Sequence, residues 1–138
     1  MSDANIPEGL RYTKGHEWAQ VDKGKNPGEI TVGITAFAVE QLGDITLVNL
    51  DVKSGDAVTA GKAFGTIESV KTLSDLYAPV SGKVVRVNGD LETKPEAVNE
   101  DTYGKGWMIV IAPTDPKDVA ALLDAKSYAE HCKTAVAH

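Results

Sequence analysis

The stretch that decides the fold is Gly65-Thr66-Ile67-Glu68-Ser69-Val70-Lys71-Thr72-Leu73-Ser74-Asp75-Leu76-Tyr77-Ala78-Pro79-Val80-Ser81-Gly82. Residues 63–70 and 72–78 both have the composition of a β-strand, and Pro79 ends the second of them. The two strands meet near Val70 and Lys71, although no Gly, Asn or Pro stands at the junction. The sequence therefore predicts a β-hairpin that holds the Lys71 ammonium group out in water at its tip.

Short strands are expected on both sides of this hairpin. The chain has 138 residues, and its 13 glycines and 6 prolines fall between short β-branched runs, a pattern typical of many short strands. The expected strands are residues 18–21, 29–34, 44–50, 83–88 and 107–111. We predict a mainly β fold in which residues 1–138 form one domain, since domains usually have ~100–200 residues. Residues 1–10 are expected to be a loose N-terminal lead-in.

Two segments have helical patterns. Residues 36–42 are predicted to form one short internal helix, with Thr35 as its N-cap and Gly43 at its end. Residues 115–136 are predicted to form a C-terminal helical segment on the outside of the β body. The polar stretch between the hairpin and the last strand, residues 89–101, is expected to be a loop with one helical turn.

Charge and composition exclude several classes of partner. The chain has 14 Lys and Arg residues against 20 Asp and Glu residues, a formal net charge of −6. An acidic chain has little with which to neutralise phosphates, so no nucleic acid is expected as a partner. No apolar run approaches the ~18–20 residues that span a bilayer, so no membrane association is expected.

The expected compartment follows from the cysteine content and from the start of the chain. The single cysteine, Cys132, cannot close an intrachain disulfide, which is typical of a reducing compartment. The first residues have neither the basic cluster nor the apolar core of a targeting segment. We therefore expect a bacterial cytoplasmic protein, or a protein of an organelle matrix if a transit peptide has been removed.

Lys71 is the residue with the clearest chemical potential. From the pattern alone, the simpler interpretation is a solvated turn lysine with acidic neighbours, Glu68 three positions before it and Asp75 four positions after it. A lysine at a rigid tip is nevertheless easy for a modifying enzyme to acylate. Acylation removes the charge and turns the side chain into a long tether.

Other motifs accompany the hairpin in a fixed order: His16-Glu17-Trp18, Val32-Gly33-Ile34-Thr35, Leu42-Gly43-Asp44-Ile45, Val98-Asn99-Glu100-Asp101 with Tyr103, Gly106-Trp107-Met108, and Leu122-Leu123-Asp124-Ala125 with Tyr128. Together with the hairpin, this ordered set resembles the H protein family of the glycine cleavage system, over about residues 10–130. The resemblance implies a barrel-sandwich hybrid of the biotinyl/lipoyl-carrier type. It also implies lipoic acid in amide linkage to Lys71.

The same resemblance implies partners and site roles. The partners would be a pyridoxal-phosphate glycine decarboxylase, a tetrahydrofolate-dependent aminomethyltransferase, a dihydrolipoamide dehydrogenase and the lipoylating enzymes. The chain would be a carrier and not an enzyme. As a small acidic carrier, it is expected to be a monomer. Glu68 and Asp75 would be recognised by the modifying enzyme, and Glu17 and Asp75 would hold the loaded arm, because carboxylates form charge-assisted hydrogen bonds with a cationic amine.

The sequence departs from the family pattern at two places. Family members usually have Ser before His-Glu-Trp, and here the residue is Gly15, so one hydroxyl contact to the loaded arm is missing. After Gly-Ile-Thr the usual Asp-Tyr or Asp-His is replaced by Ala36-Phe37. These changes put the contacts in the cleft in doubt, but they leave the attachment site intact.

Three other functions remain open at this point. A lipoyl relay would hand its cofactor to 2-oxoacid dehydrogenase complexes, and the Phe37 neighbourhood keeps that hypothesis in view. A biotin carrier is less favoured, because biotin domains prefer Met on both sides of the lysine. An unmodified interaction module is the fourth hypothesis. No metal site is expected, because His131, Cys132 and His138 fit no standard zinc spacing.

Overall fold

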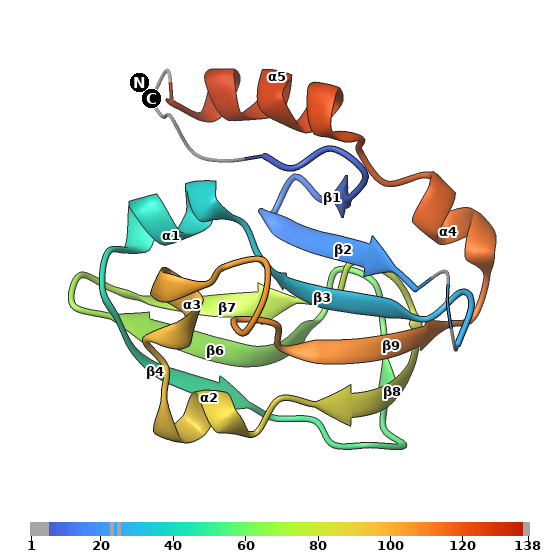
Figure 1. The fold of residues 1–138 in the computed structure, drawn as a ribbon, viewed down its shortest axis with the longest axis horizontal. Coiled ribbons are helices and arrows are strands. Elements are labelled where there is room, and N and C mark those ends of the chain that lie inside the picture. The colour runs from blue at the N-terminus through green and yellow to red at the C-terminus, as the bar shows by residue number, and fades with distance from the viewer. Residues whose placement is uncertain (1–5, 23, 25, 137–138) are drawn as a thin grey trace.

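The computed structural model describes residues 6–22, 24 and 26–136, and two antiparallel sheets organise this part of the chain (Figure 1). The six-stranded sheet has the order β1 (Arg11–Tyr12), β2 (Glu17–Val21), β3 (Ile30–Ile34), β9 (Ile109–Pro113), β8 (Gly82–Val87) and β5 (Ala57–Val58). The three-stranded sheet has the order β4 (Ile45–Leu50), β6 (Ala63–Ser69) and β7 (Leu73–Tyr77). The predicted mainly β, barrel-sandwich fold class is confirmed.

One core lies between the two sheets, and it follows from the alternation of side chains along the strands. Val32 and Ile109 are paired neighbours on β3 and β9, and both are fully buried. Ile67 of β6 and Leu76 of β7 belong to the same apolar cluster. Because successive side chains of a strand point to opposite faces, Glu68 and Asp75, which adjoin these core positions on β6 and β7, are exposed, whereas Val110 on β9 is buried on the other face of its sheet.

The predicted internal helix is present as α1 (Ala36–Leu42). The Thr35 side chain accepts a hydrogen bond from the backbone N–H of Ala38, as expected of an N-cap. The helix ends at Gly43, whose φ of 83° lies in the region that favours glycine. Both predicted ends of this helix are confirmed.

Helices α4 (Pro116–Ala120) and α5 (Ala125–Val136) form the predicted C-terminal helical segment. Figure 1 shows them on the outside of the six-stranded sheet, beyond β1 and β2. The Tyr128 ring of α5 stacks on the Tyr12 ring of β1, with ring centroids 4.6 Å apart. Trp18, Phe37 and Cys132 complete this second buried cluster.

Three local expectations were wrong. Residues 89–101 contain two short helices, α2 (Asp90–Thr93) and α3 (Ala97–Glu100), where one helical turn was expected. The last strand begins at Ile109 and includes Pro113, so Trp107 precedes it. The two-residue strands β1 and β5 were missed, because so short a segment has no periodicity to detect.

Within the described residues, no helix combines the length and the apolar character needed to cross a membrane.

Candidate functional site

The tip of the β6–β7 hairpin carries Lys71, and a serine side chain closes its turn. Val70, Lys71 and Thr72 are all exposed, whereas Ser69 is buried. The Ser69 hydroxyl oxygen accepts hydrogen bonds from the backbone N–H groups of Lys71 (3.1 Å) and Thr72 (3.2 Å). The backbone N–H of Ser69 donates to the Thr72 carbonyl oxygen at 2.8 Å. These bonds explain how the chain reverses here without Gly, Asn or Pro.

A neighbouring loop supports the tip from below. The backbone N–H of Val70 donates to the Asp44 carbonyl oxygen at 3.0 Å. On either side of Asp44, the side chain of Asn99 donates to the Gly43 carbonyl oxygen (3.0 Å) and accepts from the Ile45 N–H (2.9 Å). Asn99 belongs to α3, which is distant in the sequence. Its side chain holds the loop around Asp44, and this loop in turn holds Val70 at the hairpin tip.

The Lys71 side chain lies along Gly43. A Cβ atom at position 43 would lie 3.5 Å from Lys71 Cε and 3.8 Å from Lys71 Cδ, which are ordinary van der Waals contacts, so the lysine stem packs against the backbone of residue 43. Among the described residues, no ion pair involves Lys71. The predicted exposed lysine at a hairpin tip is therefore present, and its amine is neither buried nor held in an ionic cluster.

Glu17 lies in a very different environment, at the start of β2. Its side chain is 3% exposed. The Thr13 hydroxyl donates a hydrogen bond to Glu17 Oε1, and the backbone of Tyr77 lies near the carboxylate and favours its charged form. Burial raises the pKa of the Glu17 carboxyl above its usual range, and the Thr13 hydrogen bond and the nearby backbone N–H groups oppose the rise without cancelling it.

A groove of about 500 Å³ opens beside Glu17. The residues that line it come from the N-terminal segment, the end of β7 and the α4–α5 connection: Tyr12, Thr13, Lys14, Gly15, Glu17, Gly61, Tyr77, Ala78, Pro79, Ala121, Leu122 and Leu123. Glu17 therefore presents a poorly solvated carboxylate to a mostly apolar groove, which is a suitable place for a small cation.

Asp75 is exposed on β7 and does not line this groove. Tyr77 connects the two predicted carboxylates. Its hydroxyl donates to Asp75 Oδ2 at 3.3 Å, while its backbone lies near the Glu17 carboxylate. The Asp75 charge, with a smaller contribution from Glu17, raises the pKa of the Tyr77 hydroxyl. The sequence analysis gave no role to Tyr77, although it stands within the quoted hairpin motif.

The positions that depart from the family pattern have different consequences. A Cβ atom at Gly15 would lie 3.0 Å from Glu17 Oε1, so any larger residue here would touch the buried carboxylate. Phe37 lies outside the groove, because it is buried beneath α5 and stacks on the His16 ring with centroids 4.8 Å apart. The Ala36 backbone N–H donates to the Tyr103 hydroxyl oxygen. Of these departures, Gly15 is the one that borders the groove.

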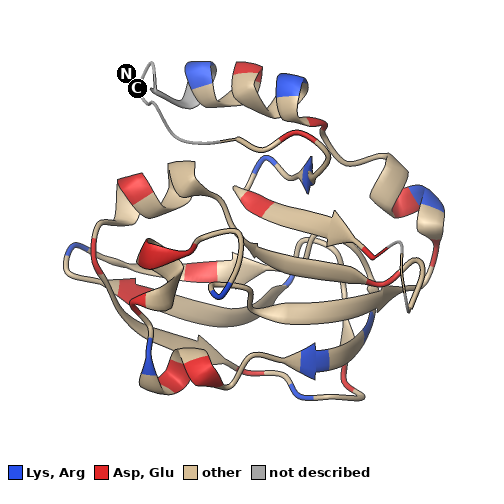
Figure 2. Cartoon of the chain, viewed as in Figure 1, with Lys and Arg blue, Asp and Glu red and all other residues tan. Residues whose placement is uncertain are grey.

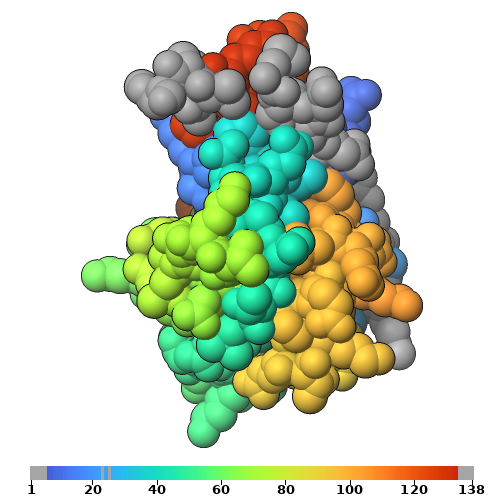
Figure 3. Space-filling model, turned by 90° about the vertical axis from the view of Figure 1, so that its left-hand side faces the viewer, coloured from blue at the N-terminus to red at the C-terminus, as the bar shows by residue number. Residues whose placement is uncertain are grey.

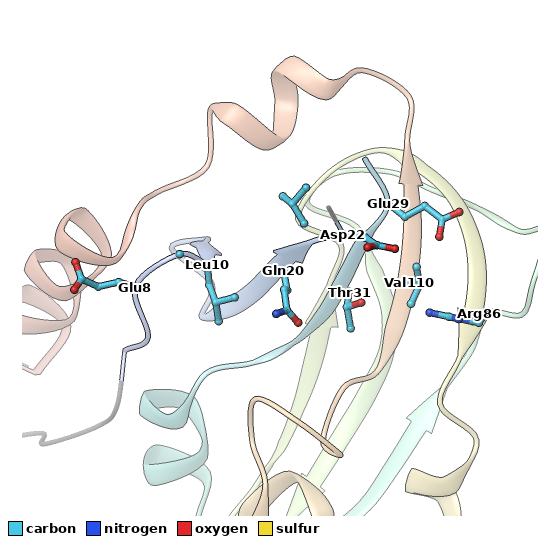
Figure 4. Close-up of a pocket in the computed structure, with 10 residues that line it drawn as sticks. Glu8, Leu10, Gln20, Asp22, Glu29, Thr31, Arg86 and Val110 are labelled. Atoms are coloured by element: carbon cyan, nitrogen blue, oxygen red, sulfur yellow. The ribbon is translucent and has the colours of Figure 1, made fainter. Parts of the chain in front are cut away.

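A second groove, of about 620 Å³, lies on the outer face of the six-stranded sheet (Figure 4). Figure 4 shows Gln20, Thr31 and Val110 on neighbouring strands, with Arg86 and Glu29 at one side. None of the residues predicted for the site, Glu17, Glu68, Lys71 and Asp75, lines it. Within the described part of the chain, no group of three or more His, Cys, Asp or Glu side chains is arranged to hold a metal ion, and His138 lies outside that part.

Comparison with known proteins agrees with this geometry. Residues 10–135 match the family model described as glycine cleavage H-protein. The chain belongs to the glycine cleavage H-protein family. It is 54% identical over 124 residues to the glycine cleavage system H protein of Anaeromyxobacter sp. (strain K), covering 89% of the chain and 92% of that protein.

Two other relatives extend the comparison. The glycine cleavage system H protein of Myxococcus xanthus is 51% identical over 128 residues, which cover 93% of the chain and 95% of that protein. The crystal structure of a glycine cleavage system H protein from Mycobacterium marinum superposes with a TM-score of 0.80 at 42% identity, covering 91% of the chain and 97% of that structure.

Proposed function

We propose that the chain is the lipoyl carrier of the glycine cleavage system and that Lys71 is the attachment residue. The observation that carries this proposal is the exposed Lys71 side chain at a hairpin tip whose backbone is held by Ser69 and by the Asp44 carbonyl. A rigid attachment point limits the volume that a tethered group can sample. The tethered group therefore meets each docked partner at a high effective concentration.

The residues present fit a lipoyl group at this position. Lys71 Nζ provides the amine for an amide bond, and the lysine side chain is exposed at the hairpin tip. When attached, the lipoyl group supplies a disulfide that carries electrons and the aminomethyl group derived from glycine. We assign recognition by the lipoylating enzyme to Glu68 and Asp75, which are both exposed on the hairpin on either side of Lys71.

We assign the holding of the loaded arm to Glu17 and Asp75. Burial deprives the Glu17 carboxylate of water, which raises the pKa of this carboxyl. A cationic amine in the groove stabilises the charged carboxylate, so it should lower that pKa. The groove walls shield the amine from bulk water. Asp75 lies outside the groove, and it is linked to the groove wall by the hydrogen bond that it accepts from the Tyr77 hydroxyl.

The partners proposed are those that the sequence implies: a pyridoxal-phosphate glycine decarboxylase, a tetrahydrofolate-dependent aminomethyltransferase, a dihydrolipoamide dehydrogenase and the lipoylating enzymes. The chain then acts as a carrier subunit, and these partners carry out the reactions. Bacterial relatives support a bacterial cytoplasmic location. The relay hypothesis gains no support, since Phe37 lies in the buried cluster beneath α5 and not at the site.

Intact mass spectrometry after expression in a lipoylating host tests the attachment. The wild-type chain should gain the mass of one lipoyl group, and Lys71→Arg, which keeps the charge, should gain none. Lipoylated wild type should also support glycine-dependent bicarbonate exchange by the cognate decarboxylase. A modified peptide that maps to another lysine would refute the attachment site, and absence of exchange would refute the shuttle function.

A further inference from the structure

Large apolar side chains are exposed on one sheet of the described structure. They are Leu47 (46% exposed), Val70 (66%), Leu73 (63%) and Tyr77 (40%). All four belong to the three-stranded sheet or to the tip of its hairpin. Clustered exposure of this kind marks an interaction site more often than single exposed residues do.

The strand register places two of these leucines in one row with a carboxylate. Leu47 of β4 pairs with Glu68 of β6, and Glu68 pairs with Leu73 of β7. All three side chains are exposed, so this row lies on the outward face of the sheet. The next row, Val48–Ile67–Ser74, points to the core. The two leucines therefore add nothing to the core, and the fold alone does not explain them.

The charge around the row is acidic. Figure 2 shows acidic positions on α1, α3, β6 and β7 on the side of the molecule that carries the hairpin tip, where the tip itself is basic. Figure 3 looks onto this end of the molecule, where the yellow-green tip stands beside α1 in cyan and the α2–α3 region in orange-yellow. A complementary partner would present apolar contacts to the leucines and cationic side chains to Glu68 and its acidic surroundings.

We propose that Leu47, Glu68, Val70 and Leu73, here named the hairpin outer face, form the docking surface for the enzyme that acylates Lys71. This inference rests on the proposed function. The acylating enzyme must bring its acyl carbon to Nζ at the root of the arm, so it covers the tip and the first row beneath it. Partners that act on the far end of the arm can meet it beside Glu17, at the opposite end of β7.

The step that this enzyme performs is amide formation. With lipoate activated as an acyl-adenylate from ATP, the neutral Lys71 amine attacks the acyl carbon. The C–N bond forms, the acyl C–O bond to the phosphate breaks, AMP leaves, and the proton of the amine passes to solvent. The hairpin outer face contributes binding and orientation to this step and takes no part in the bond changes.

The test measures lipoylation of the full apo chain by a purified ATP-dependent lipoate–protein ligase, followed by intact mass. Leu47→Gln and Leu73→Gln should each lower kcat/KM about tenfold, because truncating an interface anchor has effects of that order. Asn49→Ala is the matched control, since Asn49 lies on the same strand and face as Leu47, one outward row further from the tip. It should leave kcat/KM unchanged, and thermal unfolding should show that all variants fold.

The outcomes separate this inference from the proposed function. If the wild type is lipoylated at Lys71 but both leucine variants react at the wild-type rate, the docking surface is wrong and the carrier function stands. If the wild type is not lipoylated at Lys71, the proposed function itself fails. Leucine variants driven to full lipoylation with excess ligase should support wild-type bicarbonate exchange. A defect confined to that exchange would assign the face to the decarboxylase and overturn the inference.

Discussion

The two ends of β7 differ in almost every physical respect. At one end Lys71 is exposed and rests on backbone hydrogen bonds and the Ser69 hydroxyl. At the other end Glu17 is buried in a groove, where its carboxyl has a raised pKa. The first arrangement suits a residue that an enzyme must reach, and the second suits a charge that must be kept from water.

The largest expected effect comes from removing the charge at the buried end. Glu17→Gln should shorten the lifetime of the loaded arm, without partners present, about 10–100-fold, because a charge-assisted hydrogen bond contributes ~1.5–3 kcal/mol. The measurement is the release of ammonia and formaldehyde from purified loaded protein. Glu92→Gln, an exposed carboxylate on α2, is the control. Equal lifetimes for Glu17→Gln and wild type would remove the holding role.

The support beneath the exposed end gives the next largest effect. Asn99→Ala leaves the Gly43 carbonyl and the Ile45 N–H without their partner, which should lower the free energy of unfolding by about 2 kcal/mol. Urea denaturation measures this change, and Asn49→Ala, at an exposed asparagine, should cost much less. Lipoylation of Asn99→Ala should also slow, since the loop that fixes Val70 loosens. Wild-type stability would show that water replaces the Asn99 bonds.

Ser69→Ala should have a smaller effect that is confined to the tip. It removes the acceptor for the N–H groups of Lys71 and Thr72, and a cost of about 1 kcal/mol is expected. Hydrogen exchange should become faster at these two amides and stay unchanged in β9. Ser74→Ala, on the same hairpin, is the matched control. If protection at the tip survives, the serine does not close the turn.

The pH dependence of stability separates the two ends further. The folded state raises the pKa of the Glu17 carboxyl above its unfolded value of about 4.3, so the folded state binds the proton more tightly. Stability should therefore fall as pH rises from the unfolded pKa through the folded one. Glu17→Gln should remove this part of the fall and raise Tm at neutral pH. A lower Tm at neutral pH would contradict burial as the dominant cause.

Gly15→Ser should have the smallest effect, and it tests whether an added hydrogen-bond donor stabilises the Glu17 carboxylate. Its Cβ would lie close to Glu17 Oε1, where a hydroxyl can donate to the carboxylate. An added donor should lower the pKa of Glu17 and lengthen the lifetime of the loaded arm about 2–3-fold. The ammonia-release assay measures this lifetime, and Gly15→Ala, which adds bulk without a donor, is the control. A shorter lifetime for both variants would mean that crowding dominates.

The exposed end could be predicted from the sequence to a large extent, and the buried end much less. Alternation, Thr35 and Gly43 predicted the strands and α1, because these signals are local. The sequence also placed Lys71 at a hairpin tip, but the Ser69 closure was not predicted. Asn99 acts on a loop distant in the sequence, and its side-chain hydrogen bonds leave no periodic signal. The burial of Glu17 depends on the groove walls, including the α4–α5 connection, which only the assembled fold brings to it.

The most direct test of the account asks whether an arm rooted at Lys71 reaches Glu17. NMR titration of the 13C-labelled Glu17 side-chain carboxyl in the apo, lipoylated and loaded forms measures this. The account predicts a raised pKa in the apo form and a clear fall of that pKa only when the arm carries the cationic amine. An unchanged Glu17 pKa in the fully loaded protein would contradict it.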